Sequence, residues 1–204
     1  MDSVTHPSRE INRLLDLLPA SWRMHTIVVQ RPDQPQAIVS TPILPWQRDT
    51  QVRINFRLWS SLPVNQRDML FLGEVAWRQQ SRWLQWGTYQ LVGLFALGGT
   101  LWELLEGDVA GMAVGILLAA IAIKQIHREQ RGTKVQLEAD SEAIRIAQRR
   151  GYTDTIAARS LLEGIQAVAK LEGRQVPEFR ELVRCQNLRV LGGISQVAVP
   201  TEGD

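Results

Sequence analysis

Apolar and polar residues in the N-terminal part of the chain follow the periodicity of an α-helix. Apolar side chains recur three or four positions apart, at Ile11, Leu14, Leu15 and Leu18. This spacing, between Pro7 and Pro19, predicts a short amphipathic helix. Because its polar positions carry charges of both signs, packing against a protein core is favoured over a position on a membrane surface.

Three short runs rich in β-branched residues come next, at Thr26–Val29, Ala37–Ile43 and Gln51–Phe56. Proline-bearing segments separate them, as is typical of strands joined by turns. The runs predict a small antiparallel sheet. A long helix is then expected over Leu62–Trp83, with Pro63 at its start.

The last third of the chain has helical patterns over Lys134–Arg150, Thr155–Leu171 and Pro177–Val190. Gly151 follows the first of these where a helix C-cap is expected. The residues after Gly192 have no clear period and predict a loose tail.

The region between Arg82 and Lys124 is unusually apolar. Its only charges are Glu103, Glu106 and Asp108, which divide it into two apolar stretches. Tryptophans lie at both ends of the first stretch, where amphipathic rings meet the headgroup layers of a bilayer. This pattern predicts a transmembrane helical hairpin, with a buried hairpin of a soluble domain as the alternative.

These elements predict an α+β membrane protein that is mostly helical, with a small N-terminal antiparallel sheet and a two-helix transmembrane hairpin. The expected parts are an N-terminal cytoplasmic part (1–82), the hairpin (83–126), C-terminal cytoplasmic helices (127–191) and a flexible tail (192–204). Basic residues flank the hairpin and its tip is acidic. Both termini are therefore expected to be cytoplasmic, or stromal in a plastid, with a thylakoid or plasma membrane as the host.

Composition narrows the possible functions. The 23 basic and 21 acidic residues nearly balance, and no long basic run is present, so we expect no nucleic-acid partner. The three histidines, His6, His25 and His127, lack metal-ligand spacing. The single cysteine, Cys185, lies in an apolar-periodic stretch, which favours a packing role over a reactive thiol.

Two passages resemble the HtpX and prenyl-protease type of membrane zinc metallopeptidase. Residues 62–78, LPVNQRDMLFLGEVAWR, are similar to the helix of that family that carries its H-E-x-x-H motif. Residues 137–163, LEADSEAIRIAQRRGYTDTIAARSLLE, are similar to its E-x-x-A-D helix and the Gly-Tyr turn that follows. The chain also resembles, more weakly, a membrane-protein family of cyanobacteria and chloroplasts, which implies no activity.

The peptidase resemblance implies where a zinc site would lie, and the residues there are chemically unsuitable. Gly73 and Trp77 stand at the histidine positions, and Gln136 stands at the position of the glutamate ligand. Glycine has no ligand atom, an indole nitrogen only donates, and a neutral amide is a poor zinc ligand. Glu74, at the position of the general base, and Asp140, at that of a residue orienting a ligand histidine, are then expected to be structural. We expect no metal, no cofactor and no zinc-peptidase activity.

The leading hypothesis is a non-catalytic, peptidase-like integral membrane protein that acts as a scaffold, assembly factor or accessory subunit. Its expected partners are membrane lipids and a membrane protein. Two alternatives remain open. One is a membrane hydrolase that uses Glu74 and Asp140 with a non-standard site, and the other is a lipid- or pigment-binding protein that uses the small residues and tryptophans of the hairpin.

Overall fold

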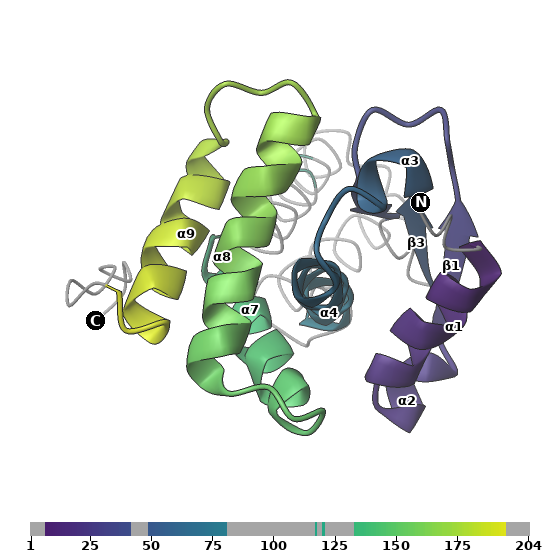
Figure 1. The fold of residues 1–204 in the computed structure, drawn as a ribbon, viewed down its shortest axis with the longest axis horizontal. Coiled ribbons are helices and arrows are strands. Elements are labelled where there is room, and N and C mark those ends of the chain that lie inside the picture. Colours follow the sequence, from purple (N-terminus) through teal and green to yellow (C-terminus); the bar gives the residue numbers. More distant parts are fainter. Residues whose placement is uncertain (1–6, 42–48, 81–116, 118–119, 121–132, 195–204) are drawn as a thin grey trace, which may run out of the picture. The chain divides into compact units, whose positions relative to one another are not determined.

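The computed structural model describes residues 7–41, 49–80, 117, 120 and 133–194. The chain divides into two compact units, one formed by Met1–Gln80 with Thr133–Asp204 and the other by Ser81–Gly132. The elements described below belong to the first unit (Figure 1). In chain order they are α1 (Pro7–Leu17), α2 (Ala20–Arg23), β1 (Thr26–Gln30), β2 (Ile38–Ser40), β3 (Thr50–Ile54), α3 (Phe56–Trp59), α4 (Val64–Gln80), α7 (Thr133–Gln148), α8 (Asp154–Leu171) and α9 (Phe179–Leu191).

The predicted N-terminal helix is confirmed as α1. Its apolar positions turn inward, so that Leu14 and Leu18 are buried in the core, with Leu15 packed against it. Pro19 is the N-cap residue of the short helix α2, which the sequence pattern did not predict.

The three predicted strands form a sheet in the order β1-β3-β2. The expected antiparallel arrangement is wrong in one of its two pairs: β2 runs antiparallel to β3, but β1 runs parallel to it, with Thr26 opposite Thr50. The sheet is therefore mixed. Side chains alternate between faces in the same way in both kinds of pair, so the hydrophobic pattern that predicted the strands does not fix their direction.

Helix α4 lies at the centre of this unit. Figure 1 shows it nearly end-on, with the sheet and α1 on one side and α7, α8 and α9 on the other. Residues 68–73 are buried without a break, so α4 has no solvent-facing side over that stretch. A helix enclosed on all sides needs apolar residues around its whole circumference, which explains the run Met69–Leu72.

The three C-terminal helices have recognisable ends. Helix α7 ends before Gly151, whose φ of 92° is the left-handed conformation expected at a helix C-terminus. The Thr153 hydroxyl accepts a hydrogen bond from the Ile156 amide at the start of α8. Glu178 and Glu181 form a reciprocal capping box at the start of α9.

The expected fold class of an α+β membrane protein with a transmembrane hairpin is also corrected. Within the described part of the chain, no helix is long and apolar enough to cross a membrane. Helix α4 has 17 residues, and the 18-residue helix α8 carries charges along its length. The segment predicted as the hairpin, 83–126, lies outside the described residues except for Leu117 and Ala120. The boundaries proposed at 82/83 and 126/127 stay predictions.

Candidate functional site

A buried ion pair between α7 and α9 lies beside α4. Arg184 donates two parallel hydrogen bonds to Asp140, from Nε to Oδ2 at 2.9 Å and from Nη2 to Oδ1 at 2.7 Å. The Asp140 side chain is completely buried, and that of Arg184 is 18% exposed. Burial by itself would lower the pKa of the guanidinium, but the charge and hydrogen bonds of Asp140 raise it above its ordinary value, and the charge of Glu74 adds to this. The Arg184 guanidinium is therefore held in its protonated form.

Gly73 provides the surface of α4 against which this pair packs. A Cβ atom at this position would lie 3.7 Å from Nη2 of Arg184 and 3.8 Å from Oδ1 of Asp140. A side chain longer than a methyl group would enter the space that the guanidinium occupies. The residue at the first histidine position of the peptidase resemblance therefore accommodates an arginine cation from another helix.

Glu74 and Arg78, one turn apart on α4, both bind the backbone of β2. Oε1 of Glu74 accepts hydrogen bonds from the Ser40 amide, at 3.0 Å, and from the Ser40 hydroxyl. Arg78 donates from Nη2 to the Ser40 carbonyl at 2.7 Å and from Nε to the hydroxyl. Because β2 is an edge strand, the two side chains satisfy backbone groups that a further strand would otherwise bind.

Trp77 follows Gly73 by one turn on α4, and Gln136 precedes Asp140 by one turn on α7. Asp140 approaches Gly73, and Tyr152, just after α7, reaches residues 65 and 68 at the start of α4, so the helices run antiparallel. This direction places Trp77 and Gln136 on the same side of the pair as each other. The Trp77 ring packs against the core, and the Arg78 guanidinium lies 4.0 Å from its centroid. Oε1 of Gln136 is buried and has no hydrogen-bond partner among the described residues.

A pocket of about 510 Å³ adjoins Glu74, Trp77, Arg78 and Arg184. Its apolar lining includes Ile38, Leu70, Trp77 and Val168, contributed by β2, α4 and α8. Its charged lining consists of Glu74, Arg78, Glu172, Arg174, Glu178, Glu181 and Arg184. We call this the charged pocket.

Arg174, which also lines the charged pocket, forms ion pairs with two carboxylates. Arg174 binds Glu181 at 2.6 Å and Glu172 at 2.9 Å, and the same Glu172 accepts a hydrogen bond from the Ala37 amide at 2.9 Å. The hydrogen bonds that Arg174 donates to Glu181 raise the pKa of its guanidinium, which burial alone would lower. The ion pairs therefore link the start of α9 to the loop before β2.

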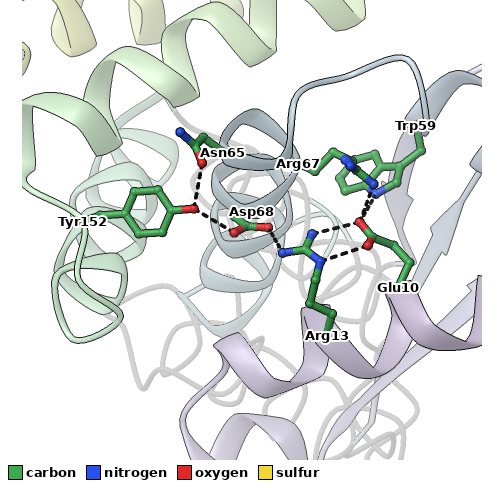
Figure 2. A network of polar contacts seen from close by, with 7 residues as sticks. All are labelled: Glu10, Arg13, Trp59, Asn65, Arg67, Asp68 and Tyr152. Atoms are coloured by element: carbon green, nitrogen blue, oxygen red, sulfur yellow. Dashed lines mark hydrogen bonds and ion pairs between the residues drawn. The ribbon is translucent and has the colours of Figure 1, made fainter. Parts of the chain in front are cut away.

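A second polar cluster, shown in Figure 2, lies at the N-terminal end of α4. Glu10 on α1 accepts hydrogen bonds from Arg13 at 2.8 and 2.9 Å and from Arg67 at 2.8 Å. Arg13 also donates to Asp68 at 2.5 Å, and the Tyr152 hydroxyl donates to the same carboxylate at 2.8 Å. Burial first, and then this hydrogen bond, raise the pKa of Tyr152 to about 12. The cluster joins α1, α4 and the turn after α7.

Sequence reasoning singled out Gly73, Glu74 and Asp140, and the structure brings all three to Arg184. It did not find Arg184, Arg78 or Ser40, which complete the arrangement. Nothing local to residue 184 marks it, because an arginine in an amphipathic helix is normally interpreted as a solvent-facing residue.

Cys185 is buried, and burial raises the pKa of its thiol. Among the described residues, no three His, Cys, Asp or Glu side chains lie close enough together to hold a metal ion.

Comparison with known proteins gives a family and one curated relative. Residues 12–152, more than half of the chain, match the family described as protein of unknown function DUF3318, and the chain belongs to this family. It is 28% identical over 156 residues to the thylakoid membrane protein slr1949 of Synechocystis sp., an alignment that covers 74% of this chain and 73% of the relative. No solved structure matches.

These findings fit the weaker of the two resemblances, to a membrane-protein family of cyanobacteria. They give no support to the resemblance to HtpX-type peptidases. The acidic residues of the site therefore have to be interpreted from their own contacts.

Proposed function

We propose that this DUF3318 protein is a membrane-associated, non-catalytic protein that acts as a scaffold, assembly factor or accessory subunit, and that a partner protein docks in the charged pocket. One observation carries the proposal. The acidic side chains of Glu74, which lines the pocket, and of Asp140, which binds the lining residue Arg184, are both bound to groups of the protein itself.

This engagement argues against the alternative of a hydrolase that uses Glu74 and Asp140. A general base needs a carboxylate that is free to approach the proton it removes. Both oxygens of Asp140 are bound to Arg184, and Glu74 holds the amide of an edge strand. In this arrangement both carboxylates stabilise the fold.

The lining of the charged pocket suits a polypeptide segment. It combines carboxylates and guanidinium groups with an apolar floor formed by side chains such as Leu70 and Val168. A segment that presents both polar and apolar side chains complements such a surface. Membrane association is proposed from the relative, which is named a thylakoid membrane protein.

The proposal is tested by co-purification of the tagged full chain from gently solubilised thylakoid membranes. Gln36 is exposed and lines the pocket, so Gln36→Trp should obstruct the pocket without disturbing the core. Met24, which is 75% exposed and does not line the pocket, provides the matched control Met24→Trp. We expect a stoichiometric partner with the wild type and the control, and roughly tenfold less of it with Gln36→Trp, equivalent to about 1.4 kcal/mol.

Two outcomes would contradict the proposal. If all three proteins run alone and crosslinking adds no partner, the protein is not a subunit or assembly factor. If Gln36→Trp retains the partner at the wild-type level, the partner does not dock in the charged pocket.

A further inference from the structure

Exposed apolar side chains gather in the last described segment of the chain. Of the ten large apolar residues that are exposed in the described part, five fall within residues 176–194, namely Val176, Phe179, Leu182, Leu191 and Ile194. Phe179 is 76% exposed, more than any of the others. A contiguous group of exposed apolar side chains marks an interaction surface, whereas single ones are ordinary.

Helix α9 has two apolar faces. Cys185 and Leu188 are buried against the neighbouring helices α7 and α8. Figure 1 shows α9 beside α8, at the edge of the helical layer. On the opposite side the apolar residues Phe179, Leu182, Val183 and Val190 recur at helical spacing, with the polar Gln186 among them. Phe179 and Leu182 are exposed, and the other three are partly buried. We call this row the outer strip of α9.

Arginines flank the outer strip. Arg180 and Arg189 are both exposed and lie on opposite sides of it in the helical projection. The third arginine of the helix, Arg184, points inward to Asp140, and the acidic Glu181 is bound to Arg174. The exposed charged residues around the strip are then Glu178, at the start of the helix, and the two arginines. Two positive charges against one negative charge make the solvent-facing charge around the strip positive.

We propose that the outer strip of α9 is a lipid-contact surface that lies in the headgroup region of an anionic bilayer. An apolar strip with cationic side chains at its margins is the arrangement of helices that lie in the plane of a membrane interface. Phe179 and Leu182 enter the acyl boundary, and the long arginine stems let their charged ends reach lipid phosphates or sulfonates. The inference rests on the proposed membrane association and specifies the surface that makes the contact.

The test places an environment-sensitive fluorophore on the full chain at single cysteines. In a Cys185→Ala background, Phe179→Cys and Leu182→Cys report on the strip, and Met24→Cys reports on an equally exposed site elsewhere. The vesicles contain either neutral lipid alone or neutral lipid with one third anionic lipid, each with and without lipid-borne quencher. Circular dichroism first confirms that the labelled variants are folded.

We expect the labels at positions 179 and 182 to shift to the blue in anionic vesicles and to be quenched at least twofold, while the label at position 24 is unaffected. Adding Arg180→Glu and Arg189→Glu should abolish most of this quenching.

If the protein sediments with vesicles but the labels at 179 and 182 behave like the label at 24, the strip is not the contact surface, although membrane association stands. Failure to sediment with any vesicle would remove both proposals. Protection of position 179 in native membranes but never in lipid vesicles would show a protein occupant and overturn the lipid assignment.

Discussion

The Glu10 carboxylate connects side chains that are far apart in the sequence. It is 3% exposed and accepts hydrogen bonds from Arg13 and Arg67, and the Trp59 indole donates to it at 3.4 Å. Burial alone would raise its pKa, but the hydrogen bonds and charge of Arg13 and the charge of Arg67 hold the pKa below its ordinary value of 4.5. Such a buried network tolerates the loss of one member poorly, because the remaining charges lose their compensation.

This lowered pKa predicts how stability depends on pH. A carboxyl group with a lowered pKa in the folded state contributes stability above its unfolded pKa, and this contribution is lost as the pH falls through the folded value. We expect Glu10→Gln to cost roughly 3 kcal/mol at pH 7 and to flatten the fall in stability below pH 4.5. Urea unfolding at a series of pH values measures both effects. Glu142→Gln, which removes an i,i+3 pair with a well-exposed Arg145, is the control and should leave the profile unchanged. An unchanged acid slope in Glu10→Gln would refute the assignment.

The ion pair of Asp140 and Arg184 should be needed for folding. Arg184→Met leaves a completely buried carboxylate without a partner, and we expect it to lower the free energy of unfolding by about 3–5 kcal/mol. Asp140→Leu leaves the guanidinium without its partner in the same way. The double variant Asp140→Leu/Arg184→Met should recover much of the loss, because no unpaired charge remains. Chemical denaturation of the four proteins forms the cycle, and equal losses that simply add would contradict a direct pair.

The contact between helix α4 and the edge strand β2 gives Glu74 a structural task. An amide at this position still offers an oxygen to the Ser40 N–H, so Glu74→Gln should change stability by less than about 1 kcal/mol. Glu74→Ala leaves the amide without its acceptor and should cost about 2 kcal/mol. If Glu74 were a general base, both variants would be inactive in vivo. Complementation of a deletion strain, read beside thermal unfolding, separates these roles, and a stable but inactive Glu74→Gln would contradict the structural one.

The packing of α4 against α8 depends on a close approach at Gly164. A Cβ atom there would lie 3.0 Å from Cγ of Leu70, an atom too near the backbone to move freely, whereas a Cβ at Gly73 meets its neighbours at 3.7–3.8 Å. Alanine gains up to about 1 kcal/mol over glycine in a helix interior. We therefore expect Gly73→Ala to be neutral or stabilising, and Gly164→Ala to be the less stable of the two by about 1–3 kcal/mol. Calorimetry measures the unfolding temperatures of both variants and tests this order. The reverse order would show that the Leu70 side chain can move to accommodate the added methyl group.

The sequence predicted the long helices and the three strands because their signals are local. Apolar spacing and punctuating residues such as Pro19, Gly151 and Pro177 locate their positions and ends, and these agree with the structure to within a few residues. The direction of β1 relative to β3 could not be predicted, because strand direction depends on how the chain returns to the sheet and leaves no mark on the alternation of side chains. The four-residue helices α2 and α3 are too short to carry a period.

The candidate site was predicted only in part, since half of it comes from long-range contacts. Gly73, Glu74 and Asp140 were found through a resemblance that the comparisons do not support, yet they do lie together. Arg184 follows Asp140 by 44 positions and is recognisable only once α9 packs beside α7. The same holds for Ser40, whose backbone groups become partners of Glu74 only through the position of β2 at the edge of the sheet.

For the molecule as a whole, the central claim is that a partner protein docks in the charged pocket of a non-catalytic, membrane-associated protein. The most direct test is photo-crosslinking in intact membranes of the native host, with a benzophenone amino acid at position 36 in the pocket lining or, as a control, at the exposed position 24. We predict one adduct of defined mass from position 36 that position 24 does not give. The same pattern from both positions, or uncrosslinked protein alone, would contradict the account.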